Sequence, residues 1–140
     1  MKKVWVRDPH ADGKVIPEDK KPIIRKRILA HAEAKYAGKY LSIDTRFKGA
    51  FCYIDAYQEP YVGKKHPTAD SGETREQYVD RLRHDPTHLC RLRYFSLDRW
   101  SVAFYTYSHE KYEPSIFPTG DWYGTLEEGF DVGAVYLNDE

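Results

Sequence analysis

The stretch from Thr87 to Phe117 constrains the fold most, because it reads as three consecutive β-strands joined by short turns. Residues 88–95 and 100–107 are rich in Tyr, Phe, Trp, Val and Leu, and turn residues bound each run. The short third run contains Pro114, which cannot donate a hydrogen bond within a sheet. We therefore predict an antiparallel three-stranded meander whose last strand lies at the edge of the sheet.

The alternation of side chains along a strand predicts which residues of the first two runs share a face. Pairing the two apolar sets requires a turn of odd length, and residues 96–98 supply a three-residue hairpin loop. The apolar face then consists of Cys90, Leu92, Tyr94, Trp100, Val102 and Phe104. The opposite face carries Arg91, Arg93, Tyr105 and Tyr107.

A separate hairpin is predicted over residues 40–57, where two alternating segments flank Lys48-Gly49. Pairing Phe47 with Ala50 sets a register in which apolar or small residues lie opposite one another on one face. The other face gathers aromatic and charged side chains, among them Asp44, Arg46, Tyr53, Asp55 and Tyr57.

Helices are predicted before, between and after these strands. The first runs from about residues 17–22 to Ala37, and its apolar residues recur at every fourth position: Ile24, Ile28, Ala32 and Tyr36. The second begins at Thr74, because Thr74 and Gln77 have the spacing of a capping box.

The third predicted helix begins at Thr125, which forms a capping box with Glu128. Its apolar stripe consists of Leu126, Phe130, Ala134 and Leu137. Gly129 and Gly133 each cost about 1 kcal/mol relative to alanine in a helix. We expect them where the helix must lie close to the sheet.

These elements predict an α+β fold: an antiparallel sheet of about five strands, made of the hairpin and the meander, with about three helices packed mainly on one face. Residues 1–19 are predicted to form an N-terminal arm and residues 20–140 a single α+β domain. The arm is polar and contains Pro9, Gly13 and Pro17.

Composition narrows the functional classes. Lys and Arg together number 22, as do Asp and Glu, so the formal net charge is zero, which argues against a dedicated duplex-DNA binder. The start of the chain lacks an apolar signal-peptide core, and no apolar run approaches the about 20 residues that span a membrane. We expect a cytoplasmic protein with no membrane association, in which Cys52 and Cys90 are buried free thiols.

The non-core face of the predicted sheet is the leading candidate site. Tyrosine rings interleaved with arginines offer stacking and charge to single-stranded nucleic acid or to a protein partner. The competing interpretations are a plain surface of cross-strand ion pairs and a homodimer interface, where Tyr and Arg are enriched. The leading hypothesis is a non-enzymatic binding domain whose binding residues are Arg46, Tyr53, Tyr57, Arg91, Arg93, Tyr105 and Tyr107.

The alternative function is a metal-assisted hydrolase or nuclease centred on Asp44 and Asp55. In the predicted register the two lie diagonally, about 7–8 Å apart at their β-carbons. Such a pair could hold a divalent cation or act as acid and base, with Glu59 just past the strand. His84 and His88 have Asp85-Pro86 between them, which breaks the helix that would align them. No metal site and no cofactor is therefore predicted.

Four segments together resemble a group of uncharacterised bacterial proteins of this size: RFKGAFCYIDAY, THLCRLRYF, WSVAFYTYSHEKYEPSIFP and GTLEEGF. The resemblance covers most of the chain after residue 20. It implies a bacterial cytoplasmic protein, and the group has no activity to carry over.

Overall fold

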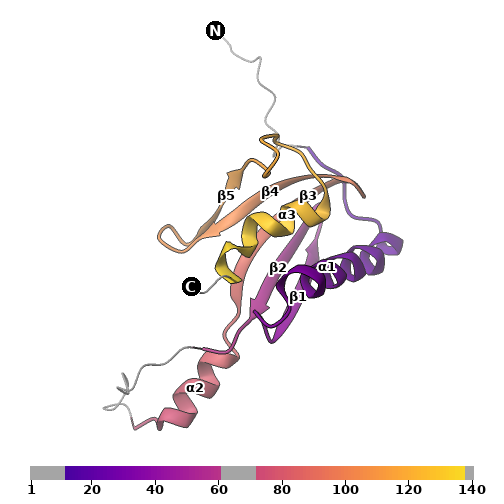
Figure 1. Ribbon diagram of the computed structural model, residues 1–140. Helices are drawn as coiled ribbons and strands as arrows, with labels where there is room; N and C mark the ends of the chain where they lie inside the picture. Colours follow the sequence, from indigo (N-terminus) through magenta and orange to yellow (C-terminus); the bar gives the residue numbers. More distant parts are fainter. Residues whose placement is uncertain (1–11, 61–71, 138–140) are drawn as a thin grey trace.

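The computed structural model describes residues 12–60 and 72–137, so most of the predicted arm and much of the loop after the first hairpin lie outside the described residues. Helical and strand elements follow one another in the predicted order (Figure 1). They are η1 (Glu18–Lys20), α1 (Lys21–Tyr36), β1 (Ser42–Lys48), β2 (Phe51–Tyr57), α2 (Arg75–Arg83), β3 (Thr87–Ser96), β4 (Arg99–Thr106), β5 (Lys111–Ser115), α3 (Leu126–Gly133) and η3 (Ala134–Leu137).

The strands form one antiparallel sheet in the order β1-β2-β3-β4-β5, which confirms the predicted α+β class. β5 contains Pro114 and lies at the edge of the sheet, as its missing N–H requires. Among the described residues, no helix is both long enough and apolar enough to cross a bilayer.

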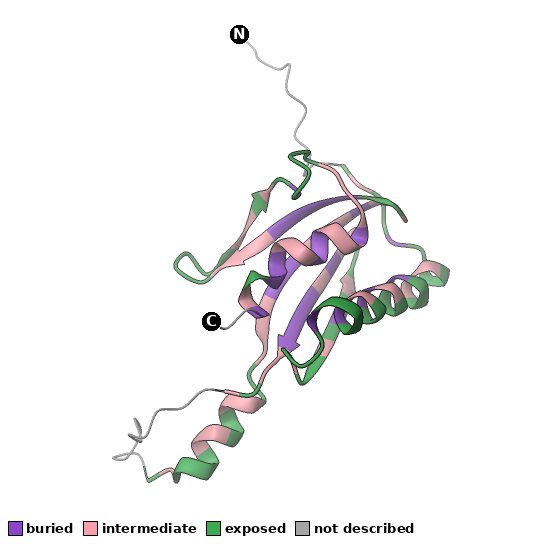
Figure 2. Cartoon of the chain, viewed as in Figure 1, coloured by how far each residue is buried: buried purple, intermediate pink, exposed green. Residues whose placement is uncertain are grey.

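Both α1 and α3 cover the same face of the sheet (Figure 1). The predicted stripe of α1 is buried, and so is the stripe that runs through α3 and η3 (Figure 2). These side chains pack against Cys52, Ile54, Leu92, Trp100 and Val102 of the sheet, each with no exposed surface. α2 differs, because it projects beyond the end of the sheet and none of its residues is buried (Figures 1 and 2).

The two glycines of α3 mark where this helix touches the sheet. A β-carbon on Gly129 would lie 2.2 Å from Cδ2 of Leu92, and one on Gly133 would lie 2.6 Å from the carbonyl oxygen of Leu89. Only glycine allows such an approach without displacement. The expectation drawn from the sequence is therefore confirmed.

Polar contacts join α1 to α3 along their length. Arg27 donates two hydrogen bonds to the carboxylate of Glu127, at 2.9 and 2.7 Å. One turn further along α3, Asp131 pairs with three side chains of α1: Tyr36 at 2.7 Å, His31 at 2.8 Å and Lys35 at 3.1 Å.

The register of the first hairpin differs from the predicted one by two residues. Lys48 lies opposite Phe51, and Gly49-Ala50 form the turn, with Gly49 at φ +60°. A shift of two residues leaves every side chain on its predicted face, so the apolar pattern cannot detect it. The turn decides instead, because two-residue hairpin turns favour glycine at positive φ.

The turn between β3 and β4 also differs in detail. The predicted apolar pairs form, with Leu92 opposite Val102 and Tyr94 opposite Trp100. However, Ser96 pairs with Arg99, so the turn has two residues, and the register shifts between Tyr94 and Ser96.

The segment that precedes α1 is bound to the sheet. Ile16 is 1% exposed and belongs to the core. The backbone N–H of Lys14 donates to the carbonyl of Tyr94 at 2.9 Å, and that of Ile16 donates to the carbonyl of Gly49 at 3.0 Å.

Candidate functional site

The face of the sheet opposite α1 and α3 is called the outer face below. Strand register assigns the aromatic and charged residues to it, because Tyr53 lies opposite Arg91, and Phe51 lies opposite Arg93. Its members with long or aromatic side chains include Asp44, Arg46, Lys48, Phe51, Tyr53, Asp55, Tyr57, His88, Arg91, Arg93, Tyr105 and Tyr112.

Arginines stack on rings across this face. The Arg91 guanidinium lies 4.4 Å from the ring centre of Phe51, and the Arg93 guanidinium lies 4.5 Å from the same ring. The Arg46 guanidinium lies 4.8 Å from the ring centre of Tyr53. Stacking of this kind fixes each guanidinium group over a ring and leaves its charge available to a further partner.

Tyr112 of the edge strand β5 lies at the centre of a cluster of rings and arginines, called the ring cluster below. Its ring centre is 5.0 Å from that of Tyr105 and 5.5 Å from that of Tyr53, both edge-to-face. The Arg91 guanidinium lies 5.4 Å from the same ring, and the His88 imidazole lies 6.5 Å from it. Burial and the charge of Asp55 raise the pKa of Tyr112 well above its usual value.

A β-bulge brings His88 to the outer face. Ile54 pairs with Cys90, but the next residue, Asp55, pairs with His88, so Leu89 is the extra residue of β3. Leu89 turns into the core with no exposed surface, and His88 faces outward beside Asp55. Bulges of this kind re-aim side chains and are common beside active sites.

Asp55 is 4% exposed, and its charge is met by two partners. His88 Nδ1 lies 2.9 Å from Oδ1, and Arg46 donates to Oδ2 at 3.3 Å. A carboxylate beside Nδ1 fixes the proton of a neutral imidazole on that nitrogen. In that tautomer Nε2 carries no proton, and the His88 side chain is 33% exposed.

The outer face carries more positive than negative charge, although the whole chain is neutral. The cationic side chains of Arg46, Lys48, Arg91 and Arg93 outnumber the two carboxylates there, those of Asp44 and Asp55. The excess favours an anionic partner.

Arg93 also has a structural role. It donates to the carbonyl of Asp12 at 2.9 Å, and its side chain lies against Gly13. Its Nε and the hydroxyl of Ser101, which lies opposite, are both buried without a hydrogen-bond partner. Arg91 is therefore the cleaner probe of binding.

The remaining predicted binding residues lie at the end of the sheet. Tyr57 is the last residue of β2, and Tyr107 follows β4. The Tyr107 hydroxyl accepts the backbone N–H of His88 at 2.7 Å, and its ring packs edge-to-face on Tyr136 of η3. Tyr107 thus supports the bulge, while Arg46, Tyr53, Arg91 and Tyr105 lie within the ring cluster.

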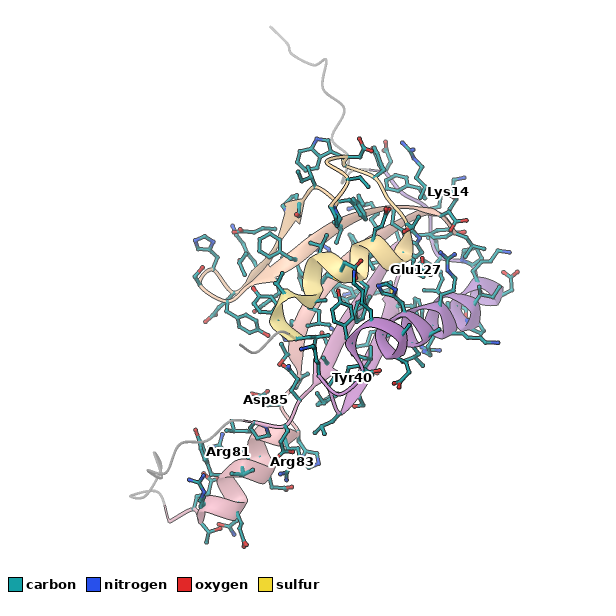
Figure 3. All side chains as sticks on the ribbon, viewed as in Figure 1. Lys14, Tyr40, Arg81, Arg83, Asp85 and Glu127 are labelled. Atoms are coloured by element: carbon teal, nitrogen blue, oxygen red, sulfur yellow. The ribbon has the colours of Figure 1, made fainter. Side chains whose placement is uncertain are left out.

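The three carboxylates of the alternative site are not gathered together. Asp44 lies directly opposite Asp55, a correction to the diagonal placement, while Asp55 is paired with Arg46 and His88. Glu59 accepts two hydrogen bonds from Arg83 of α2, at 2.8 and 2.6 Å. Figure 3 shows Arg83 beyond the end of the sheet. No cluster of three or more metal-ligating side chains occurs among the described residues.

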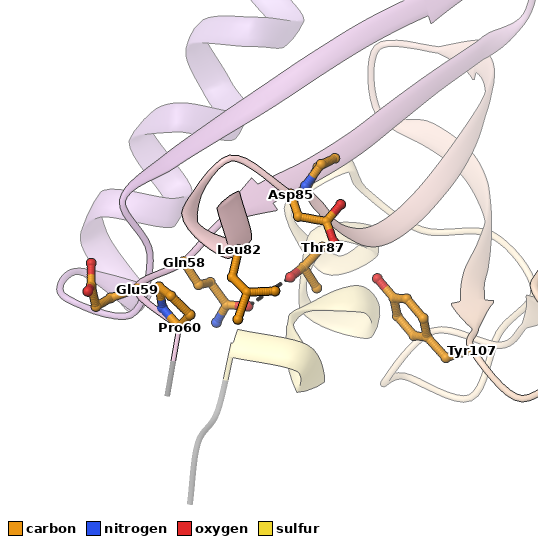
Figure 4. A pocket seen from close by; sticks show the side chains of 8 residues that line it. Gln58, Glu59, Pro60, Leu82, Asp85, Thr87 and Tyr107 are labelled. Carbon is orange, nitrogen blue, oxygen red and sulfur yellow. Dashed lines mark hydrogen bonds between the residues drawn. The ribbon is translucent and has the colours of Figure 1, made fainter. Parts of the chain in front are cut away.

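A cavity of about 430 Å³ lies where α2 meets the end of the sheet (Figure 4). Glu59, Leu82, Asp85 and Tyr107 are among its lining residues, and Thr87 donates to Gln58 across it at 3.1 Å. Its one ion-paired carboxylate, Glu59, is already bound by Arg83. The outer face offers more unsatisfied charge and stacking surface.

Comparison of the chain with protein-family models, with curated proteins and with solved structures finds no significant match. The resemblance noted in the sequence therefore stays a prediction, and the geometry of the outer face carries the functional argument.

Proposed function

We propose that the outer face binds single-stranded nucleic acid. The observation that carries this proposal is the set of arginines stacked on rings across β1, β2, β3 and β5, on a face that α1 and α3 leave uncovered. In this proposal the guanidinium groups contact phosphates and the bases stack on the aromatic rings. Each stacked base contributes about 1–3 kcal/mol to the binding free energy.

A single nucleic-acid strand fits the outer face better than a duplex does. Bases of a single strand can splay out and stack on a sheet surface, as they do on other aromatic-bearing sheets. A duplex hides those faces, and a neutral chain lacks the basic excess of duplex binders.

The test is a titration of the protein into a short fluorescein-labelled oligodeoxythymidylate, followed by anisotropy. Wild type should bind, and Arg91→Ala should bind more weakly because a stacked cation is lost. Arg25→Ala is the matched control, since the Arg25 guanidinium lies 5.1 Å from the ring of Phe47 on the helix-covered face. Equal losses in both variants would contradict the proposal.

The same residue types are also enriched at homodimer interfaces. A dimer formed through the outer face would cover the stacked arginines. Light scattering on the free protein should therefore give a mass near 16.4 kDa. A stable dimer that Arg91→Ala dissociates would favour the interface instead.

A further inference from the structure

His88, Asp55 and Tyr112 form a group whose chemistry simple binding does not require. The bulge at Leu89 interrupts the β2–β3 ladder, and its result is an outward imidazole held by a buried carboxylate. A structural ion pair could form without this interruption, because Arg46 already reaches Asp55. The arrangement instead holds Nδ1 against Asp55, and it leaves the other imidazole nitrogen of a partly exposed side chain available to a ligand.

Two atoms of this group that lack hydrogen-bond partners in the described part of the chain can act as a proton acceptor and a proton donor. Among the described residues, neither Nε2 of His88 nor the hydroxyl of Tyr112 has a hydrogen-bond partner. With Nδ1 protonated against Asp55, Nε2 can accept a proton. Tyr112 carries its proton at neutral pH, as an ordinary phenol does, and burial raises its pKa further.

We infer that the outer face cleaves single-stranded RNA, with His88 as general base and Tyr112 as general acid, an inference that rests on the proposed function. Nε2 takes the proton of a ribose 2′-hydroxyl, and the 2′-oxygen bonds to the adjacent phosphorus. The P–O5′ bond breaks, and the leaving 5′-oxygen takes the proton of Tyr112. The products are a 2′,3′-cyclic phosphate and a 5′-hydroxyl, and the proton on His88 returns to Tyr112 through water.

The other residues of the group have defined roles in this reaction. Asp55 is a positioning residue, which fixes the tautomer and stabilises the imidazolium. Arg91, 5.4 Å from the Tyr112 ring, and Arg46 supply positive charge where the phosphorane becomes more negative. The step consumes no second reactant, since the nucleophile belongs to the RNA itself.

The experiment uses a fluorescein-labelled oligouridylate and its 2′-deoxy analogue, both in EDTA, with binding read by anisotropy and cleavage by electrophoresis. Wild type should bind both strands, cut only the RNA and leave 2′,3′-cyclic ends detectable by mass spectrometry. His88→Gln should lower the single-turnover rate at least about 100-fold while the deoxy analogue still binds.

His109→Gln is the matched control, because His109 pairs with Glu113 at 2.7 Å in an exposed position on the β4–β5 hairpin. It should cut RNA as fast as wild type. Tyr112→Phe, which removes one oxygen, should also slow cleavage without loss of binding, and it carries the test if His88→Gln fails to fold.

Wild type that binds both strands and cuts neither would overturn this inference and leave the proposed function standing. Equal cleavage by wild type and His88→Gln would overturn it as well. Absence of binding to either strand would refute the proposed function and the inference together.

Discussion

Replacing Gly133 by alanine tests how firmly α3 holds the part of β3 that carries His88. A β-carbon there would lie 2.6 Å from the carbonyl oxygen of Leu89 and 2.7 Å from its carbonyl carbon. Contacts between such atoms are normally about 3.5 Å, so helix and strand must separate by nearly 1 Å. Because the atoms belong to the backbone, no side-chain rotation relieves the overlap.

Two opposing energies set the expected size of the effect. Overpacking a core costs about 1–3 kcal/mol, and a backbone overlap belongs in the upper half of that range. Alanine regains about 1 kcal/mol of helix propensity. We expect Gly133→Ala to lower the free energy of unfolding by about 1–2 kcal/mol.

Urea unfolding followed by tryptophan fluorescence measures this change, since Trp100 has no exposed surface. Ala34→Gly, at an exposed position of α1, is the control for propensity and should cost about 1 kcal/mol. If Gly133→Ala instead stabilises the protein by a similar amount, the close approach of α3 to the bulge is wrong.

Three further predictions concern stability and reactivity. Burial raises the pKa of Asp131, but its hydrogen bonds lower the pKa more, so the pKa in the folded protein is below the usual value. The ionised Asp131 therefore stabilises the fold above about pH 4, and this stabilisation is lost as the pH falls through the folded pKa. Asp131→Asn should therefore cost about 2 kcal/mol at pH 7 and progressively less as the pH falls below about 4 in urea titrations, and a cost that does not change with pH would contradict this. Thr125→Ala should cost about 1 kcal/mol through its lost cap, whereas Thr74→Ala, on a helix without buried residues, should speed only local hydrogen exchange. Burial raises the pKa of Cys52 to about 12 and that of Cys90 well above its usual value. Neither thiol should therefore react with Ellman's reagent at pH 8 until the protein unfolds. Rapid reaction in the native state would refute the burial of these thiols.

The faces of the sheet could be predicted because side-chain alternation has a period of two. Arg91 and Tyr53 share the outer face for that reason alone, and apolar spacing likewise identified the buried stripes of α1 and α3. The same period explains the error in the first hairpin. A slip of two residues preserves both faces, so only the geometry at Gly49 could decide the register.

The pairing of His88 with Asp55 was not predicted, because strict alternation assigns His88 to the core side together with Cys90 and Leu92. The signal was the adjacent apolar pair Leu89-Cys90, which breaks the alternation of β3 and indicates a bulge. Tyr112 could not be placed from the sequence for another reason, because apolar alternation alone does not fix the pairing of the short last strand.

The salt dependence of binding tests most directly whether the stacked arginines of the outer face meet phosphates. The logarithm of the association constant for an oligodeoxythymidylate should fall linearly with the logarithm of the salt concentration, and Arg91→Ala should make that slope shallower by about 0.7, the value for one phosphate contact on a single strand. Arg25→Ala should leave the slope unchanged. A wild-type slope near zero, or one that Arg91→Ala does not alter, would contradict the account.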